Sequence, residues 1–174
     1  FLFYGATGCG KSETARVIAD ELFGGRLHKE DMNTYSAEHS VARFIGSPPG
    51  YIDSGKLTPF LSFIGGAAGG GVLLLDEIEK AHPVVMDHIM EMLDTGFFRS
   101  AAGTVFDART LFIIMTSNVV TSRSAGARAI GFAGAAECAD SDIEPLRKSG
   151  VFRNEFLGRI QLAAFFDELA PEAV

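Results

Sequence analysis

The stretch FLFYGATGCGKSETARVIADELF, residues 1–23, decides most of what the sequence says about the fold. Its first four residues are apolar and a glycine-rich turn follows at once, which is typical of a buried strand. From Lys11 to Phe23 the apolar residues recur at helical spacing, and Gly24 and Gly25 then end the predicted helix. The chain therefore opens on a strand, a glycine loop and a helix.

The loop matches the pattern G-x-x-x-x-G-K-[ST] at Gly5, Gly10, Lys11 and Ser12. Glycines let the backbone curl so that several N–H groups point inward, and the helix that follows presents its positive end to the same point. A lysine here reaches the β- and γ-phosphates of a nucleotide, and the serine hydroxyl can ligate Mg²⁺. A glycine turn with an incidental lysine is the less favoured interpretation. The predicted nucleotide contacts are Gly5, Ala6, Thr7, Gly8, Cys9, Gly10, Lys11, Ser12 and Glu13.

Two acids follow a second apolar run, VLLL at residues 72–75. In a doubly wound sheet the carboxyl ends of the strands line the ligand crevice. Asp76 is then placed to hold Mg²⁺ through water, and Glu77 to polarise an attacking water as general base. Acids that only cap the next helix are the alternative, which the phosphate loop makes less favourable.

A third apolar run, IIMTSN at residues 113–118, ends in an amide. Asn118 is expected to have a role at the nucleotide, where it would orient the water or touch the γ-phosphate, or else to cap a helix, and the spacing alone does not choose between the site role and the cap.

The remaining segments alternate between strand and helix patterns. We expect a weak strand at 27–32, a helix over 36–45 capped by Ser36, a loop at 46–55, a short helix at 57–64 and a glycine spacer at 65–71. Pro83 is expected to open a helix that runs to residue 94, before a hairpin at 96–109 and a long small-residue loop at 120–142. Helical segments at 143–150 and 152–159 and a last strand at 160–166 complete an α/β fold, a parallel sheet flanked by helices on both faces.

Composition narrows the class of protein. The 174 residues suit one domain, and a hydrophobic content of 47% supports a folded core. The net charge is −7 and no run of lysine or arginine stands out, so we expect no nucleic-acid partner. Two cysteines, Cys9 and Cys138, are expected as free thiols in a reducing, cytoplasmic compartment. No apolar run is long enough to span a membrane, and the missing initiator methionine predicts a fragment of a larger protein.

Several stretches together resemble the AAA+ ATPases, and more closely the second ATPase module of ClpA/ClpC-like unfoldases. Residues 1–23 look like the Walker A strand, loop and helix of that family, and VLLLDEIEKAHPVVMDHIMEMLDTG at 72–96 looks like its Walker B strand and following helix. HSVARFIGSPPGY at 39–51 is similar to its pore-loop entrance, FDARTLFIIMTSN at 106–118 to its sensor-1 strand, and FRNEFLGRI at 152–160 to its arginine-finger helix.

The resemblance implies a P-loop NTPase fold, with residues 1–174 forming an AAA+ large subdomain whose C-terminal helical lid is absent. It also implies ATP and Mg²⁺ as cofactors and a hexameric ring of identical subunits. In that family's terms Asp76 and Glu77 are the Walker B pair, and Asn118 is sensor 1. Arg159 is the expected arginine finger for a neighbouring subunit's nucleotide, since a guanidinium forks onto phosphate oxygens, and Arg153 is the reserve candidate.

Two further positions are implied to meet other proteins. Tyr51 matches the aromatic pore-loop residue that grips a substrate polypeptide, and a buried loop tyrosine is the alternative. Ile130, Gly131 and Phe132 resemble the loop that docks on a ClpP-like peptidase, and a loop anchored on its own core is the alternative. We therefore expect an ATP-hydrolysing motor of a protein unfoldase that feeds a peptidase. A disaggregase or secretion-linked relative without a peptidase, or a nucleotide-gated scaffold without hydrolysis, are the competing hypotheses.

The sequence departs from the family pattern in three places. The loop after Tyr51 is short, GGAAGGG replaces a basic stretch before residue 72, and LGRIQ at 157–161 lacks the usual asparagine and acid around the arginine. These changes predict altered substrate grip and subunit contacts. We also expect residues 1–174 alone to hydrolyse ATP poorly.

Overall fold

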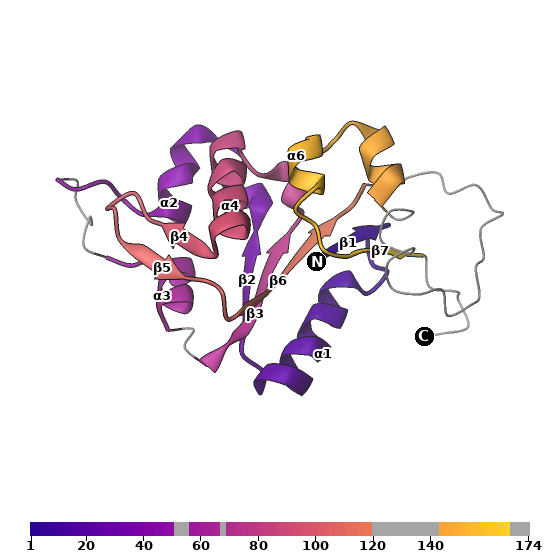
Figure 1. The fold of residues 1–174 in the computed structure, drawn as a ribbon, viewed down its shortest axis with the longest axis horizontal. Coiled ribbons are helices and arrows are strands. Elements are labelled where there is room, and N and C mark those ends of the chain that lie inside the picture. Colours follow the sequence, from indigo (N-terminus) through magenta and orange to yellow (C-terminus); the bar gives the residue numbers. More distant parts are fainter. Residues whose placement is uncertain (51–55, 67–68, 120–142, 168–174) are drawn as a thin grey trace.

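The fold is built on a parallel sheet of five strands in a computed structural model, which describes residues 1–50, 56–66, 69–119 and 143–167. The strand order is β2-β3-β6-β1-β7, and every neighbouring pair is parallel. The bounds are β1 Leu2–Gly5, β2 Leu27–Asp31, β3 Gly71–Asp76, β6 Leu111–Ser117 and β7 Ala163–Phe166. The parallel α/β fold predicted from the alternating pattern is confirmed (Figure 1).

One face of the sheet is covered by α1, Lys11–Phe23. Alternate strand residues point to opposite faces, so Val72 and Leu74 of β3 pack with Ala15 and Ala19 of α1. Leu73 and Leu75 belong to the core on the other face. Because β3 is buried on both faces, its sequence is a continuous apolar run.

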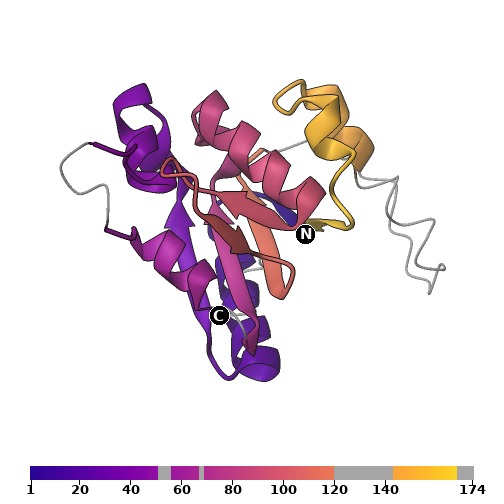
Figure 2. The same cartoon turned by 60° about the vertical axis from the view of Figure 1, so that its left-hand side comes forward.

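The opposite face carries the larger core and most of the helices (Figure 2). Phe44, Phe60 and Phe98 meet there, with the first two rings stacked at 4.2 Å between centroids. Residues 143–149 are also helical. The elements around this core are α2 Val41–Ile45, α3 Pro59–Gly65, α4 Pro83–Thr95, α6 Asn154–Leu157 and the antiparallel hairpin of β4 Phe97–Arg99 and β5 Val105–Asp107, with short 3-10 turns η1 Met32–Tyr35, η2 Glu38–Ser40 and η4 Ile78–Lys80.

Two local predictions were wrong. The helix expected over 36–45 is a 3-10 turn followed by the five-residue α2, and Ser36 does not cap it. Ser36 instead follows η1 as its C-cap, with a helical backbone and its N–H donating to the Asn33 carbonyl, whereas an N-cap residue is extended. The glycine spacer is also shorter than predicted, because Gly65 ends α3 and Gly71 begins β3.

The sheet register brings the polar strand ends to one edge. Leu75 of β3 pairs with Met115 of β6, and Tyr4 of β1 pairs with Ser117 of β6. The residues that follow each strand therefore emerge side by side. Among the residues that the structure describes, no helix has the length and apolar character needed to cross a membrane.

Candidate functional site

The loop between β1 and α1 depends on two glycines with left-handed backbones. Gly10 has φ 92° and immediately precedes α1. Gly5 has φ 140°, and a Cβ built on it would lie 2.1 Å from the Phe166 carbonyl oxygen of β7. The loop can therefore curl at the amino end of α1, where free N–H groups and the helix dipole favour an anion.

Lys11 is buried inside this loop, with 6% of its surface exposed. Its ammonium donates to the Gly5 carbonyl at 2.8 Å, to the Ala6 carbonyl at 2.7 Å and to Asn118 Oδ1 at 3.1 Å. The Cys9 sulfur lies 3.6 Å from the same nitrogen. These oxygens fix the cation at the base of the loop and link it to Asn118, the residue directly after β6.

The carboxylate of Asp76 is contacted by donor side chains from three elements. Ser12 Oγ of α1 donates to Asp76 Oδ1 at 3.3 Å, the Thr116 hydroxyl of β6 donates to the same oxygen, and Lys29 Nζ of β2 lies 2.5 Å from Oδ2. Burial disfavours the charged carboxyl, but the bonds from Lys29, Thr116 and Ser12 and the charge of Lys29 outweigh it and hold the pKa of Asp76 below 3.8. Asp76 is therefore a carboxylate at neutral pH.

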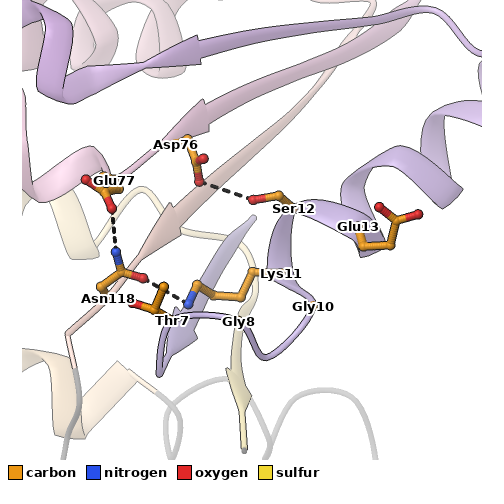
Figure 3. Close-up of a pocket in the computed structure, with 9 residues that line it drawn as sticks. All are labelled: Thr7, Gly8, Gly10, Lys11, Ser12, Glu13, Asp76, Glu77 and Asn118. Atoms are coloured by element: carbon orange, nitrogen blue, oxygen red, sulfur yellow. Dashed lines mark hydrogen bonds between the residues drawn. The ribbon is translucent and has the colours of Figure 1, made fainter. Parts of the chain in front are cut away.

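Glu77 has φ 56° and ψ 51°, a left-handed backbone. Its N–H donates to Thr116 Oγ1 at 3.1 Å, and its Oε1 accepts from Asn118 Nδ2 at 2.7 Å. The Asn118 amide thus bridges Glu77 and Lys11, as Figure 3 shows. The backbone N–H of Asn118 is held in turn by Glu79 Oε1 at 3.1 Å.

These side chains surround one cavity of about 300 Å³ at the carboxyl edge of the sheet (Figure 3). Small-molecule sites begin at about this size. The buried cation of Lys11 and the acids Asp76 and Glu77 therefore face the same space, and that charge arrangement suits a polyphosphate with a divalent metal. The lining residues are Thr7, Gly8, Gly10, Lys11, Ser12, Glu13, Asp76, Glu77 and Asn118.

The donor set at Ser12 and Asp76 fits Mg²⁺, which takes hydroxyl and carboxylate oxygens and keeps several waters. No cluster of three or more histidine, cysteine, aspartate or glutamate side chains that could hold a metal occurs in the described part of the chain. A resident metal cage is therefore not present there, and the metal fits better as a companion of substrate phosphates.

The other predicted nucleotide contacts occupy different places. Gly5, Ala6 and Cys9 are not among the residues that line the cavity, and the Cys9 thiol donates to the Ala6 carbonyl at 2.8 Å. Glu13 lies at the rim, and its exposed carboxylate pairs with Arg16 at 2.7 Å. Tyr51, Cys138 and the triplet Ile130, Gly131 and Phe132 lie outside the described residues.

The two arginines expected near a nucleotide do not enter this cavity. Arg159 pairs with Asp94, and Arg153 pairs with Asp87 at 3.0 Å, both on α4. Arg159 also lines a separate cavity of about 390 Å³ beside the end of α4 and the start of β6. Neither guanidinium reaches the loop of its own chain.

Three residues of the site were missed by sequence reasoning: Lys29, Thr116 and Glu79. Thr116 and Glu79 carried a weak signal, since each lies two residues from an expected site residue at a strand end. Lys29 carried none, because only the parallel pairing of β2 with β3 brings it beside Asp76.

The chain is similar in sequence to a known protein family and to several characterised proteins. The family model "AAA domain (Cdc48 subfamily)" matches residues 1–163. The "ATP-dependent Clp protease ATP-binding subunit ClpC" of Staphylococcus epidermidis is 38% identical over 183 residues, which cover 99% of this chain and 22% of that protein. The ClpC subunit of Staphylococcus saprophyticus gives the same figures.

A solved structure is similar over the same length. A closed-state cryo-EM reconstruction of Hsp104 with ATPγS and FITC casein superposes with a TM-score of 0.73 and 31% identity, over 99% of this chain and 29% of that one. The chain thus spans between a fifth and a third of the length of these similar proteins.

Proposed function

Because this chain belongs to the AAA domain family, and within it to the Clp-type AAA+ ATPases, we propose that it is the ATP-hydrolysing motor module of a ring-forming protein unfoldase. One observation carries the proposal: Asn118 joins the ammonium of Lys11 to the carboxylate of Glu77 inside a single cavity. A phosphate-binding cation and a general base are thereby held at a fixed separation.

In this proposal the triphosphate of ATP lies on the loop, with the amino end of α1 and Lys11 facing its negative charge. Ser12 and Asp76 would hold Mg²⁺. When bound, this metal neutralises charge on the β- and γ-phosphate oxygens.

Hydrolysis then follows from the positions of the acids. Glu77 accepts a proton from the attacking water, and the water oxygen forms a bond to the γ-phosphorus of ATP. The bond between this phosphorus and the β–γ bridging oxygen breaks, which gives ADP and phosphate. Asn118 keeps the Glu77 carboxylate directed into the cavity. Lys11 offsets the charge that develops on the phosphate oxygens.

The similar proteins support a protein substrate. The Hsp104 reconstruction contains ATPγS together with FITC casein, and the ClpC proteins are ATP-binding subunits of an ATP-dependent Clp protease. We therefore extend the proposal to a cytoplasmic hexamer in which Arg159 acts on a neighbour's nucleotide and Tyr51 grips a polypeptide.

The decisive experiment replaces Glu77 by glutamine in the full-length protein. Glu77→Gln is expected to bind a fluorescent ATP analogue with a Kd within about threefold of wild type, while the turnover number falls at least about a hundredfold. Glu21→Gln, an exposed acid on α1, is the matched control and should leave both quantities unchanged. Undiminished turnover in Glu77→Gln would remove Glu77 as the base.

The competing hypotheses separate in two further assays. Deletion of Ile130 to Phe132 should abolish binding to a Clp peptidase while ATPase activity persists, and no loss of binding would favour a disaggregase or secretion-linked protein. Phosphate release by the full-length protein decides against a scaffold, whereas nucleotide binding without release would favour one.

A further inference from the structure

Thr116 is a buried hydroxyl that contacts both acids of the site. It lies on β6 with 1% of its surface exposed. Its hydroxyl donates a hydrogen bond to Asp76 Oδ1, and its oxygen accepts the Glu77 N–H at 3.1 Å. One side chain on a neighbouring strand thus joins the metal-side carboxylate to the backbone of the base.

The Glu77 backbone needs such a restraint. Among the described residues, Glu77 alone has positive φ without being glycine. A side chain with a Cβ disfavours this left-handed conformation, so surrounding bonds must maintain it. The Glu77 N–H is held by Thr116 and the Glu77 carbonyl by Lys80 N–H at 2.9 Å, which starts the turn η4.

This turn sets the direction of the Glu77 side chain. With the backbone left-handed, the carboxylate reaches Asn118 Nδ2 at 2.7 Å and faces the cavity. A relaxed right-handed or extended backbone at Glu77 would send the carboxylate elsewhere, because the Cβ direction changes with φ and ψ.

We propose that Thr116 is a positioning residue for hydrolysis, whose single hydroxyl sets the orientation of Asp76 toward the metal and of Glu77 toward the water. The inference rests on the proposed ATPase function. Thr116 touches neither nucleotide nor water in this role and acts only through the two acids.

Two substitutions separate the hydroxyl from the shape of the side chain. Thr116→Val keeps the branch at Cβ and nearly the same shape but removes both hydrogen bonds, whereas Thr116→Ser keeps the hydroxyl. Ser117→Ala is the matched control. Ser117 also carries a buried hydroxyl on β6, but its oxygen accepts the Val119 N–H rather than a group of Asp76 or Glu77.

We expect Thr116→Val in the full-length protein to lower kcat at least tenfold. Its Kd for a fluorescent ATP analogue without Mg²⁺ should stay within threefold of wild type. Thr116→Ser should retain at least half of wild-type kcat, and Ser117→Ala should stay within twofold. If Thr116 had only a structural role, Thr116→Val would weaken nucleotide binding without Mg²⁺ as well as kcat, and Thr116→Ser would not restore kcat.

Metal binding gives a readout that does not depend on turnover. Mn²⁺ titration of the nucleotide complex, followed by electron paramagnetic resonance, should show at least fivefold weaker affinity in Thr116→Val and near wild-type affinity in Thr116→Ser. A crystal structure of Thr116→Val should show Glu77 with negative φ. If Thr116→Val does not fold, Thr116→Cys, whose thiol is a weak hydrogen-bonding group, replaces it with the same expected losses.

The inference is overturned if Thr116→Val keeps wild-type kcat and Mn²⁺ affinity, if serine does not rescue, or if Ser117→Ala causes the same losses. A wild-type protein that binds nucleotide without turnover refutes the proposed function instead. In that case Mn²⁺ affinity and the Glu77 backbone in Thr116→Val still decide the role of Thr116.

Discussion

The guanidinium of Arg159 forms a two-pronged ion pair with the carboxylate of Asp94 on α4. Nε lies 2.6 Å from Oδ1 and Nη2 lies 2.7 Å from Oδ2, and Nη1 donates to the Glu155 carbonyl. The hydrogen bond from Arg159 lowers the pKa of Asp94, and the same bond raises that of Arg159. The arginine proposed to act on a neighbour is therefore held on the surface of its own chain, with 30% of its side chain exposed.

The action of Arg159 on a neighbouring subunit predicts complementation between variants. Homomeric Arg159→Ala and homomeric Glu77→Gln should each lose at least about 99% of ATPase activity, since an arginine finger contributes about 10³-fold or more in related phosphoryl transfers and loss of the base is expected to cost at least about a hundredfold. Mixed rings should regain activity, because an intact Glu77 and a neighbour's intact Arg159 then meet at some interfaces. Phosphate release across mixing ratios measures this, and the absence of any recovery would place Arg159 in a role within its own chain.

Weakening the Asp94 pair should release Arg159. We expect Asp94→Asn to raise turnover about two- to fivefold in the assembled protein, because an exposed ion pair of this kind must open before Arg159 reaches another phosphate. Asp87→Asn, which removes the partner of Arg153 on the same helix, is the control and should change turnover less. Lower turnover in Asp94→Asn would show that Asp94 aims Arg159 rather than competing for it.

Lys29 should make stability depend on pH through Asp76. The folded-state pKa of Asp76 is depressed below 3.8, so its contribution is present above that value and is lost as pH falls through the folded-state pKa. Lys29→Met should therefore destabilise the protein by about 1 kcal/mol at pH 7, a modest figure because solvent screens the half-exposed lysine.

The pH dependence of thermal unfolding tests this. The difference in Tm between wild type and Lys29→Met should shrink as pH falls below about 4, where the Asp76 carboxyl of the unfolded chain begins to take up a proton, and should vanish below the lower folded-state pKa. Lys148→Met, on an exposed helical pair with Glu144, should show no comparable trend. A difference in Tm that stays constant from pH 7 to pH 3 would contradict the pairing of Lys29 with Asp76.

Gly5 should tolerate no side chain. A Cβ there would lie 2.1 Å from the Phe166 carbonyl oxygen. Both Gly5 and Phe166 are paired backbone of neighbouring strands, so neither can shift without breaking the sheet. Gly5→Ala is expected to cost at least ~3 kcal/mol of unfolding free energy. Gly103 also has a positive φ, 82°, but a Cβ there would meet nothing within 4 Å, so Gly103→Ala is expected to cost about 1 kcal/mol. Equal losses in urea unfolding would mean that β7 does not pack on Gly5 as described.

The sequence predicted β1, β3, β6, α1 and α4 well because these strands are continuous apolar runs and the two helices are bounded by glycine or proline, whereas 27–32 gave only a weak strand signal. The helix at Lys11–Phe23 has the predicted bounds, and the strand at β3 begins one residue earlier than predicted. The prediction for 36–45 was wrong because Ser36 ends η1 with a helical backbone, φ −80° and ψ −21°, whereas an N-cap residue is extended. Ala37 has that extended backbone instead and begins the next turn, η2. Helix caps and turns compete locally for the same hydroxyl and N–H groups.

The sequence by itself determined the glycine-rich loop and the acidic pair Asp76 and Glu77, on which the proposed nucleotide chemistry rests, because residue type and spacing within one segment define both features. The tertiary structure decided how Asn118 spans Lys11 and Glu77, why Lys29 lies against Asp76, and that Thr116 holds both acids. Those contacts join residues that are 39 to 107 positions apart in the chain. They arise from the register of parallel strands, which no single segment of sequence encodes.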